Sequence, residues 1–122
     1  MPGDKKQHDI YERIYQFILC VLLFIRYIPK TAENLVAVGQ IGRSVTSMGA
    51  NSQEADGAES KNDFVHKFSV VRKETKETKF WLRLLGDLNP TKKSAAWELI
   101  QEAQEIINII SSIIQKTKAK RQ

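Results

Sequence analysis

Long segments with helical hydrophobic periodicity are the feature that most constrains the fold of this chain. In the first segment, Ile10, Ile14, Phe17 and Val21 follow one another at spacings of four, three and four residues. Such spacing places the side chains on one face of an α-helix. Only three of the 122 residues are proline, which favours long helices over many short strands. The sequence therefore predicts an all-α fold.

Short polar connections separate the periodic segments. Short loops between long amphipathic helices are typical of an antiparallel up-and-down four-helix bundle. A chain of this length suffices for one domain with one core, so residues 1–122 are expected to form a single domain. We expect a short frayed N-terminus and a basic C-terminal tail. The predicted helices cover residues 9–27, 32–55, 61–85 and 92–117.

Several residues are typical of helix ends. Thr31 is expected to cap the second helix and Thr91 the fourth, because a hydroxyl can accept a bond from a free backbone N–H. Ser60 followed by Asp63 resembles a capping box at the start of the third helix. Gly86 is expected to end the third helix as a C-terminal cap.

The second helix contains Gly39, Gly42 and Gly49. A glycine inside a helix costs on the order of 1 kcal/mol relative to alanine. We therefore expect another backbone to come close to this helix, so that packing between the two offsets the stability that the glycines cost.

The longest apolar stretch without a charge runs from Ile14 to Ile25, which is too short for a bilayer span of about 20 residues. Acidic Asp9 and Glu12 precede it, and no small-residue cleavage site follows, so we expect no secretory signal. Cys20 lies within the stretch and is expected to be a buried small hydrophobe in a reducing compartment. The predicted location is the cytoplasm.

A polar stripe follows the second helix at spacings of 3, 4, 4 and 3, and consists of Gln40, Arg43, Ser47, Asn51 and Glu54. Its expected partners on the third helix are Lys73, Glu74 and Glu77. Polar groups between helices are costly unless they are hydrogen-bonded. We predict a structural network that specifies one helix pairing, with Arg43 buried against Glu77, so that Glu77→Ala destabilises the bundle strongly. The predicted network comprises Gln40, Arg43, Asn51, Glu54, Glu74 and Glu77.

The first and last helices are more apolar than one core requires. The first carries a second stripe of Tyr11, Tyr15, Ile18, Leu22 and Ile25, and the fourth carries one of Leu99, Ile106 and Ile113. Large exposed apolar patches usually mark protein interfaces, so we expect a homo-oligomer. The alternative is a monomer with one wide core stripe.

Basic residues concentrate in the second half of the chain. Residues 1–60 hold six Lys or Arg against seven Asp or Glu, whereas residues 61–122 hold thirteen against seven. A line of cations can neutralise phosphates, which predicts salt-sensitive nucleic-acid binding. A solvated basic face with interspersed acids is the alternative. The predicted binding residues are Arg72, Lys76, Lys79 and Arg83 on the third helix and Lys116, Lys118, Lys120 and Arg121 in the tail.

Catalytic and metal-binding patterns are missing from the sequence. No Ser/His/Asp or Cys/His set accompanies the carboxylates. A di-iron bundle needs two Glu-x-x-His motifs, but the only histidines are His8, near the N-terminus, and His66, which is expected at the surface. No Gly-rich phosphate loop precedes a Lys-Ser or Lys-Thr pair. We expect no enzyme activity, no metal and no cofactor.

The residues of the second and third helices resemble those of the small four-helix-bundle proteins encoded in 23S rRNA intervening sequences. The resemblance is strongest between residues 40 and 85, and one departure is Ala55, where a glycine is usual. It implies a bacterial, ring-forming homopentamer with a basic surface. Similar accessory proteins of diversity-generating retroelements are associated with a reverse transcriptase and nucleic acid. The matching positions are Gln40, Arg43, Ser47, Asn51, Glu54, residues 61–64, Lys73, Glu74, Glu77, Thr78, Trp81 and Leu82.

These observations predict a non-enzymatic oligomeric bundle that binds nucleic acid, with structured RNA favoured. One alternative is an adaptor that docks a larger enzyme such as a reverse transcriptase. Another is a purely structural oligomer.

Overall fold

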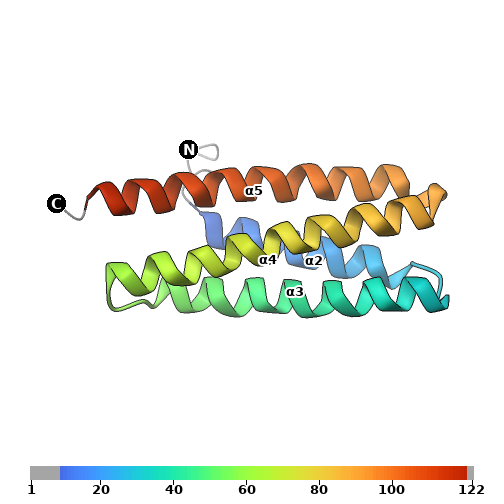
Figure 1. Ribbon diagram of the computed structural model, residues 1–122, viewed down its shortest axis with the longest axis horizontal. Helices are drawn as coiled ribbons and strands as arrows, with labels where there is room; N and C mark the ends of the chain where they lie inside the picture. Colours follow the sequence, from blue (N-terminus) through green and yellow to red (C-terminus); the bar gives the residue numbers. More distant parts are fainter. Residues whose placement is uncertain (1–8, 121–122) are drawn as a thin grey trace.

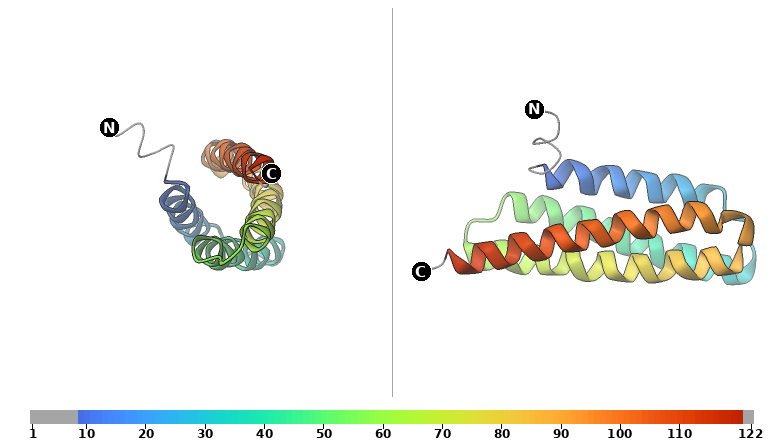
Figure 2. Two further views of the ribbon diagram at one scale, coloured as in Figure 1. Left: turned by 90° about the vertical axis from the view of Figure 1, so that its left-hand side faces the viewer. Right: turned by 90° about the horizontal axis from the view of Figure 1, so that it is seen from above.

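The computed structural model describes residues 9–120 and shows a bundle of four long helices (Figure 1). Successive helices run in opposite directions and lie side by side, and α5 returns beside α2 (Figure 2). The predicted all-α four-helix bundle is therefore confirmed. The expected frayed N-terminus, with His8, and Arg121 of the tail lie outside the described residues. The elements are α2 (Ile10–Arg26), α3 (Ala32–Asp56), α4 (Lys61–Leu88), a short 3₁₀ turn η1 (Pro90–Lys92) and α5 (Lys93–Ala119).

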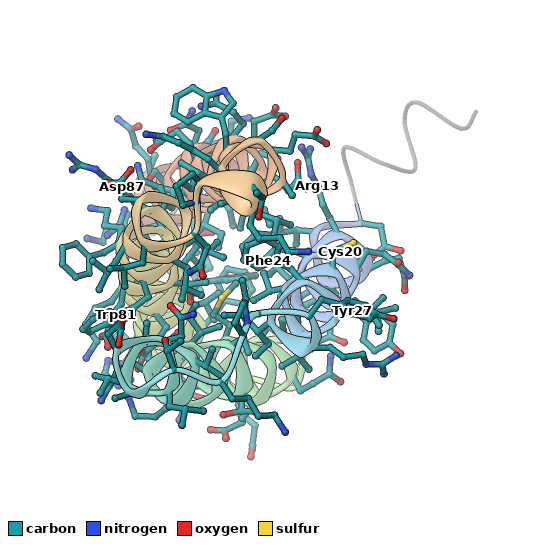
Figure 3. All side chains as sticks on the ribbon, turned by 90° about the vertical axis from the view of Figure 1, so that its right-hand side faces the viewer. Arg13, Cys20, Phe24, Tyr27, Trp81 and Asp87 are labelled. Carbon is teal, nitrogen blue, oxygen red and sulfur yellow. The ribbon has the colours of Figure 1, made fainter. Side chains whose placement is uncertain are left out.

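One core fills the space between the four helices. On α2, the predicted stripe from Ile10 to Val21 is buried, and Phe24 points inward between the helices (Figure 3). On α3, Leu35 is half exposed, whereas the neighbouring Ala37 is buried. Among the helices of residues 9–120, none combines the length and apolar character needed to cross a bilayer.

The N-terminal caps of α3 and α4 match the sequence expectation. The Thr31 hydroxyl accepts a bond from the Asn34 backbone N–H at 3.2 Å, and the Ser60 hydroxyl accepts one from Asp63 at 3.0 Å. Each cap satisfies one of the backbone donors that a helix start leaves free.

The caps expected at Gly86 and Thr91 are wrong, because α4 extends past Gly86 and the turn η1 lies between α4 and α5. α4 continues through Gly86 to Leu88, and Gly86 is buried where α5 crosses. A Cβ at this position would lie 3.2 Å from the Cβ of Ala96, so the glycine allows the two helices to approach. Thr91 lies inside η1, and α5 begins at Lys93 without a side-chain cap.

The expected close approach at the α3 glycines is also largely wrong. Nothing lies within 4 Å of a Cβ placed at Gly39 or Gly42, whereas one at Gly49 would meet Ile18 of α2 at 3.3 Å. Cys20, expected in the core, is exposed on the outer side of α2 (Figure 3). Only one side of α2 faces the bundle, so a residue within its apolar stretch can still be exposed.

Of the two expected second stripes, only the one on α2 is exposed, and only in part. On α5, the expected second stripe packs into the core, since Ile106 is fully buried and Leu99 and Ile113 are partly buried. The expectation of an exposed apolar stripe on this helix is therefore wrong. On α2, Tyr11, Ile18 and Ile25 of the expected stripe are partly buried against the core. Its other members, Tyr15 and Leu22, are exposed, and Leu19, Leu23 and Tyr27, which directly follows the helix, complete the outer face of α2.

A reciprocal amide pair joins the two connections at one end of the bundle. The side-chain amides of Asn34 and Asn89 each donate to the other's carbonyl oxygen at 2.9 Å. Asn34 also donates to the Pro29 carbonyl, and Asn89 to the Leu85 carbonyl. Asn34 is buried, so these bonds replace water and fix the start of α3 against the end of α4.

An ion cluster holds α2 against α5. Arg13 binds both carboxylate oxygens of Glu102, at 2.7 and 2.8 Å, and reaches Glu105 at 2.6 Å. These bonds, led by the one to Glu102, raise the pKa of Arg13. A two-pronged pair of this kind fixes orientation as well as distance.

We expect Asn34→Ala to lower the free energy of unfolding by about 1–3 kcal/mol, because it removes the bonds that the buried Asn34 side chain makes to Asn89 and to the Pro29 carbonyl. Urea unfolding followed by circular dichroism measures the change. Asn62→Ala, at an exposed asparagine of α4, is the matched control and should leave stability nearly unchanged. Equal effects of the two variants would show that the amide pair adds nothing.

Candidate nucleic-acid interface

The predicted basic stripe lies along the junction of α4 and α5, which we call the α4–α5 seam. Arg72 donates from Nη1 to the Ser111 hydroxyl at 3.1 Å, and Lys79 donates from Nζ to the side-chain oxygen of Gln104. The two helices lie side by side along their length (Figure 2). Lys76 and Arg83 belong to the same stripe and are exposed.

Ion pairs within the described residues do not neutralise the cations of the seam. Across residues 9–120, none of Arg72, Lys76, Lys79 and Arg83 forms a salt bridge with a carboxylate. The partners of Arg72 and Lys79 are a hydroxyl and an amide, which orient a cation without neutralising it. The seam is therefore a line of positive potential.

Four acidic residues of the same helices are directed to other helices. Glu74 and Glu77 alternate with the cations in the sequence of α4, but both bind Arg43 of α3. Glu102 and Glu105 of α5 bind Arg13 of α2. Asp87 of α4 binds Lys93 of α5 beside Arg83, and Glu98 of α5 is exposed. The four acids that bind α2 and α3 do not compensate the charge of the seam.

The C-terminal tail extends the seam beyond Arg72. Lys116, Lys118 and Lys120 are exposed at the end of α5. Lys61, at the start of α4, donates to the Lys120 carbonyl at 3.0 Å and adds a cation that sequence reasoning missed. Since α4 and α5 are antiparallel, the tail lies at the opposite end from Arg83.

The polar stripe of α3 lies at its junction with α4, but it forms separate groups instead of one network. Arg43 binds Glu77 and lies 3.5 Å from both Glu74 oxygens, with Gln40 accepting from its Nε at 3.4 Å. The bond to Glu77, and then the charge of Glu74, raise the pKa of Arg43. The Arg43 side chain was expected to be buried but is 49% exposed, whereas that of Glu74 is 8% exposed.

The remaining members of the stripe bind partners other than Arg43 and its two glutamates. Asn51 donates to the Ser47 carbonyl one turn earlier. Glu54 binds Lys67 at 2.6 Å, and this hydrogen bond raises the pKa of Lys67. Lys73, an expected partner of the stripe, is exposed.

Buried hydroxyls between α3 and α4 were missed by sequence reasoning. Ser44 and Thr78 share a hydrogen bond of 2.6 Å inside the core, and Thr78 also donates to the Glu74 carbonyl. Their pairing depends on the register between the helices, which periodicity does not give.

Within residues 9–120, no group of three or more His, Cys, Asp or Glu side chains is placed to hold a metal ion. His66 is exposed on α4, as expected.

Comparisons with known proteins place these features in a family. A family model described as 23S rRNA-intervening sequence protein matches residues 6–112. A similar solved structure is that of a protein with unknown function from the S23 ribosomal protein family of Bacteroides thetaiotaomicron. It has 29% sequence identity and a TM-score of 0.80, and the match covers 90% of this chain and 98% of that chain. No curated protein matches the chain.

We expect Glu77→Ala to shift the urea midpoint much less than Asn34→Ala does. Arg43 stays solvated and keeps Glu74 as a neighbour, and exposed ion pairs contribute little to stability. The same unfolding assay measures both variants. If Glu77→Ala lowers the free energy of unfolding as much as Asn34→Ala does, the Arg43–Glu77 ion pair contributes as much stability as the sequence analysis expected of a buried pair.

Proposed function

This chain belongs to the family of 23S rRNA-intervening sequence proteins, and from that premise we propose that it is a non-enzymatic, oligomeric bundle that binds nucleic acid. The binding surface is the α4–α5 seam, extended by the basic tail. Structured RNA is the favoured ligand, and this preference rests on the family rather than on a particular contact.

The observation that carries the proposal is that the four cations of the seam have no carboxylate partner within residues 9–120. Arg72 and Arg83 are separated by about 16 Å along α4, at 1.5 Å per residue. That distance spans several phosphates of one strand. Binding releases the counterions condensed on those phosphates, so the affinity depends steeply on salt concentration.

Self-association is the second part of the proposal. The outer face of α2 presents leucines and tyrosines to solvent, and apolar patches of this kind are typical of protein interfaces. A second copy of the chain is the proposed occupant of this face. Each additional copy repeats the seam, so weak contacts with one RNA combine through effective concentration.

An adaptor function is the alternative that the same surfaces support. The oligomeric ring would then dock a larger enzyme, such as a reverse transcriptase, and the seam would meet an acidic surface of that partner. This alternative predicts an oligomer that does not bind RNA even at low salt.

We expect the double variant Lys76→Glu/Arg83→Glu to weaken RNA binding by roughly tenfold or more, because both cations are exposed and would be replaced by charges that repel phosphate. Fluorescence anisotropy with a structured RNA, at about 50 mM and about 200 mM salt, measures the affinity and its salt dependence. The salt slope should fall by about 2, or one per lost contact.

The matched control is Arg26→Glu/Lys30→Glu, which changes the net charge equally at exposed cations away from the seam. It should retain most of the binding. If the two double variants lose RNA affinity equally, the effect comes from net charge alone, and the seam is not the binding surface. Circular dichroism verifies that both variants are folded.

We expect Leu23→Glu to convert the oligomer to a monomer, because it places a charge in the α2 face. Light scattering coupled to size-exclusion chromatography measures the mass. Leu88→Glu is the matched control, since Leu23 and Leu88 are both 41% exposed and only Leu23 lies on α2. A monomeric unaltered protein, or an oligomer that persists in Leu23→Glu, would contradict the proposed interface.

A further inference from the structure

A pocket of about 760 Å³ opens at one end of the α4–α5 seam, where the chain passes from α4 through η1 into α5. Volumes of roughly 300–1,000 Å³ are usual for small-ligand sites. Arg83 belongs both to the pocket wall and to the basic stripe. The pocket is therefore continuous with the proposed binding surface.

The floor of the pocket is apolar and its side wall is aromatic. Gly86 and Ala96 are buried at the crossing of the helices, and Ile100 is partly buried beside them. The indole of Trp97 lines the pocket and is 60% exposed, although it is one of the largest apolar side chains in the protein. A wide aromatic face is thus available to a ligand from solution.

The rim of the pocket is polar and carries positive charge. Lys93 binds Asp87 at 3.1 Å, so this pair is neutral as a unit. Arg83 is not paired with a carboxylate in the described part of the chain, and the Ser94 hydroxyl lies in the lining. The rim therefore offers one uncompensated cation beside hydrogen-bonding groups.

A ligand that fits these walls combines a flat ring with an adjacent negative charge. A nucleotide has both, because its base can stack on an indole while its phosphate meets a guanidinium. A base inside a duplex is paired and stacked on both faces, so it enters a pocket only after an extrusion that costs a few kcal/mol. An unpaired base enters without that cost and is therefore preferred.

We propose that this pocket receives an unpaired base of the bound RNA, which stacks on Trp97 while its phosphate lies at Arg83. The inference rests on the proposed function and deepens it, because it makes loops and single strands the preferred part of the RNA. Cations of the seam then hold the flanking backbone. Trp97 is the residue that distinguishes unpaired from paired RNA.

The test uses the full chain with Trp81→Phe, which leaves Trp97 as the only one of the two tryptophans. One RNA probe is a hairpin with an unpaired loop, and the other is a fully paired duplex of equal nucleotide count. The hairpin should quench Trp97 fluorescence and bind more tightly than the duplex. Trp97→Ala, in the otherwise unaltered chain, should weaken hairpin binding by about 5- to 100-fold and change duplex binding little.

Val36→Ala is the control, because Val36 is an apolar residue of similar exposure, 64% against 60% for Trp97, and lies on α3, which contributes to neither the seam nor the α2 face. It should not change hairpin binding. Equal affinity for both probes without quenching, or an equal loss for both in Trp97→Ala, would overturn the inference and leave the proposed function standing. If neither the hairpin nor the duplex binds at low salt, both the inference and the proposed function are wrong.

Discussion

The separation of opposite charges onto the two flanks of α4 is the constraint on which the rest of the structure depends. Glu74 and Glu77 face α3 and bind Arg43, whereas Arg72 and Lys79 face α5 and bind neutral oxygens. Helical geometry produces the separation, since residues two or five apart lie on different sides of a helix. The acids thereby help to specify the α3–α4 pairing, and the cations are left together on the other flank.

That separation gives the seam its chemical character. If the acids of α4 lay beside its cations, salt bridges would cancel most of the positive potential. Neutral partners on α5 instead hold Arg72 and Lys79 in place with their charge intact. At the end of the seam, Gly86 lets α5 cross closely over α4, and the crossing forms the floor of the pocket beside Trp97. The pocket and the cations of the seam thus both lie on α4 and α5.

The sequence predicted those features that depend on near neighbours in the chain. Helix positions followed from periodicity, and the caps at Thr31 and Ser60 followed from residues three positions away. Gly86, Thr91 and Cys20 were misread, because their surroundings are decided by helices far away in the sequence or by the turn η1. The line of cations was visible from its spacing, but its neutral partners and the pocket were not, since both require the register of α4 against α5.

The arrangement of the helices also decides whether self-association and RNA binding can coexist. A ring of subunits could bury the seam at its contacts, which would leave the cations unable to reach a phosphate. However, α2 neighbours α3 and α5, and α4 lies across the bundle from it (Figure 2). The apolar face of α2 points away from the core and therefore away from α4. Association through α2 would bury its leucines and still leave the outward side of α4, with Lys76 and Arg83, open to solvent.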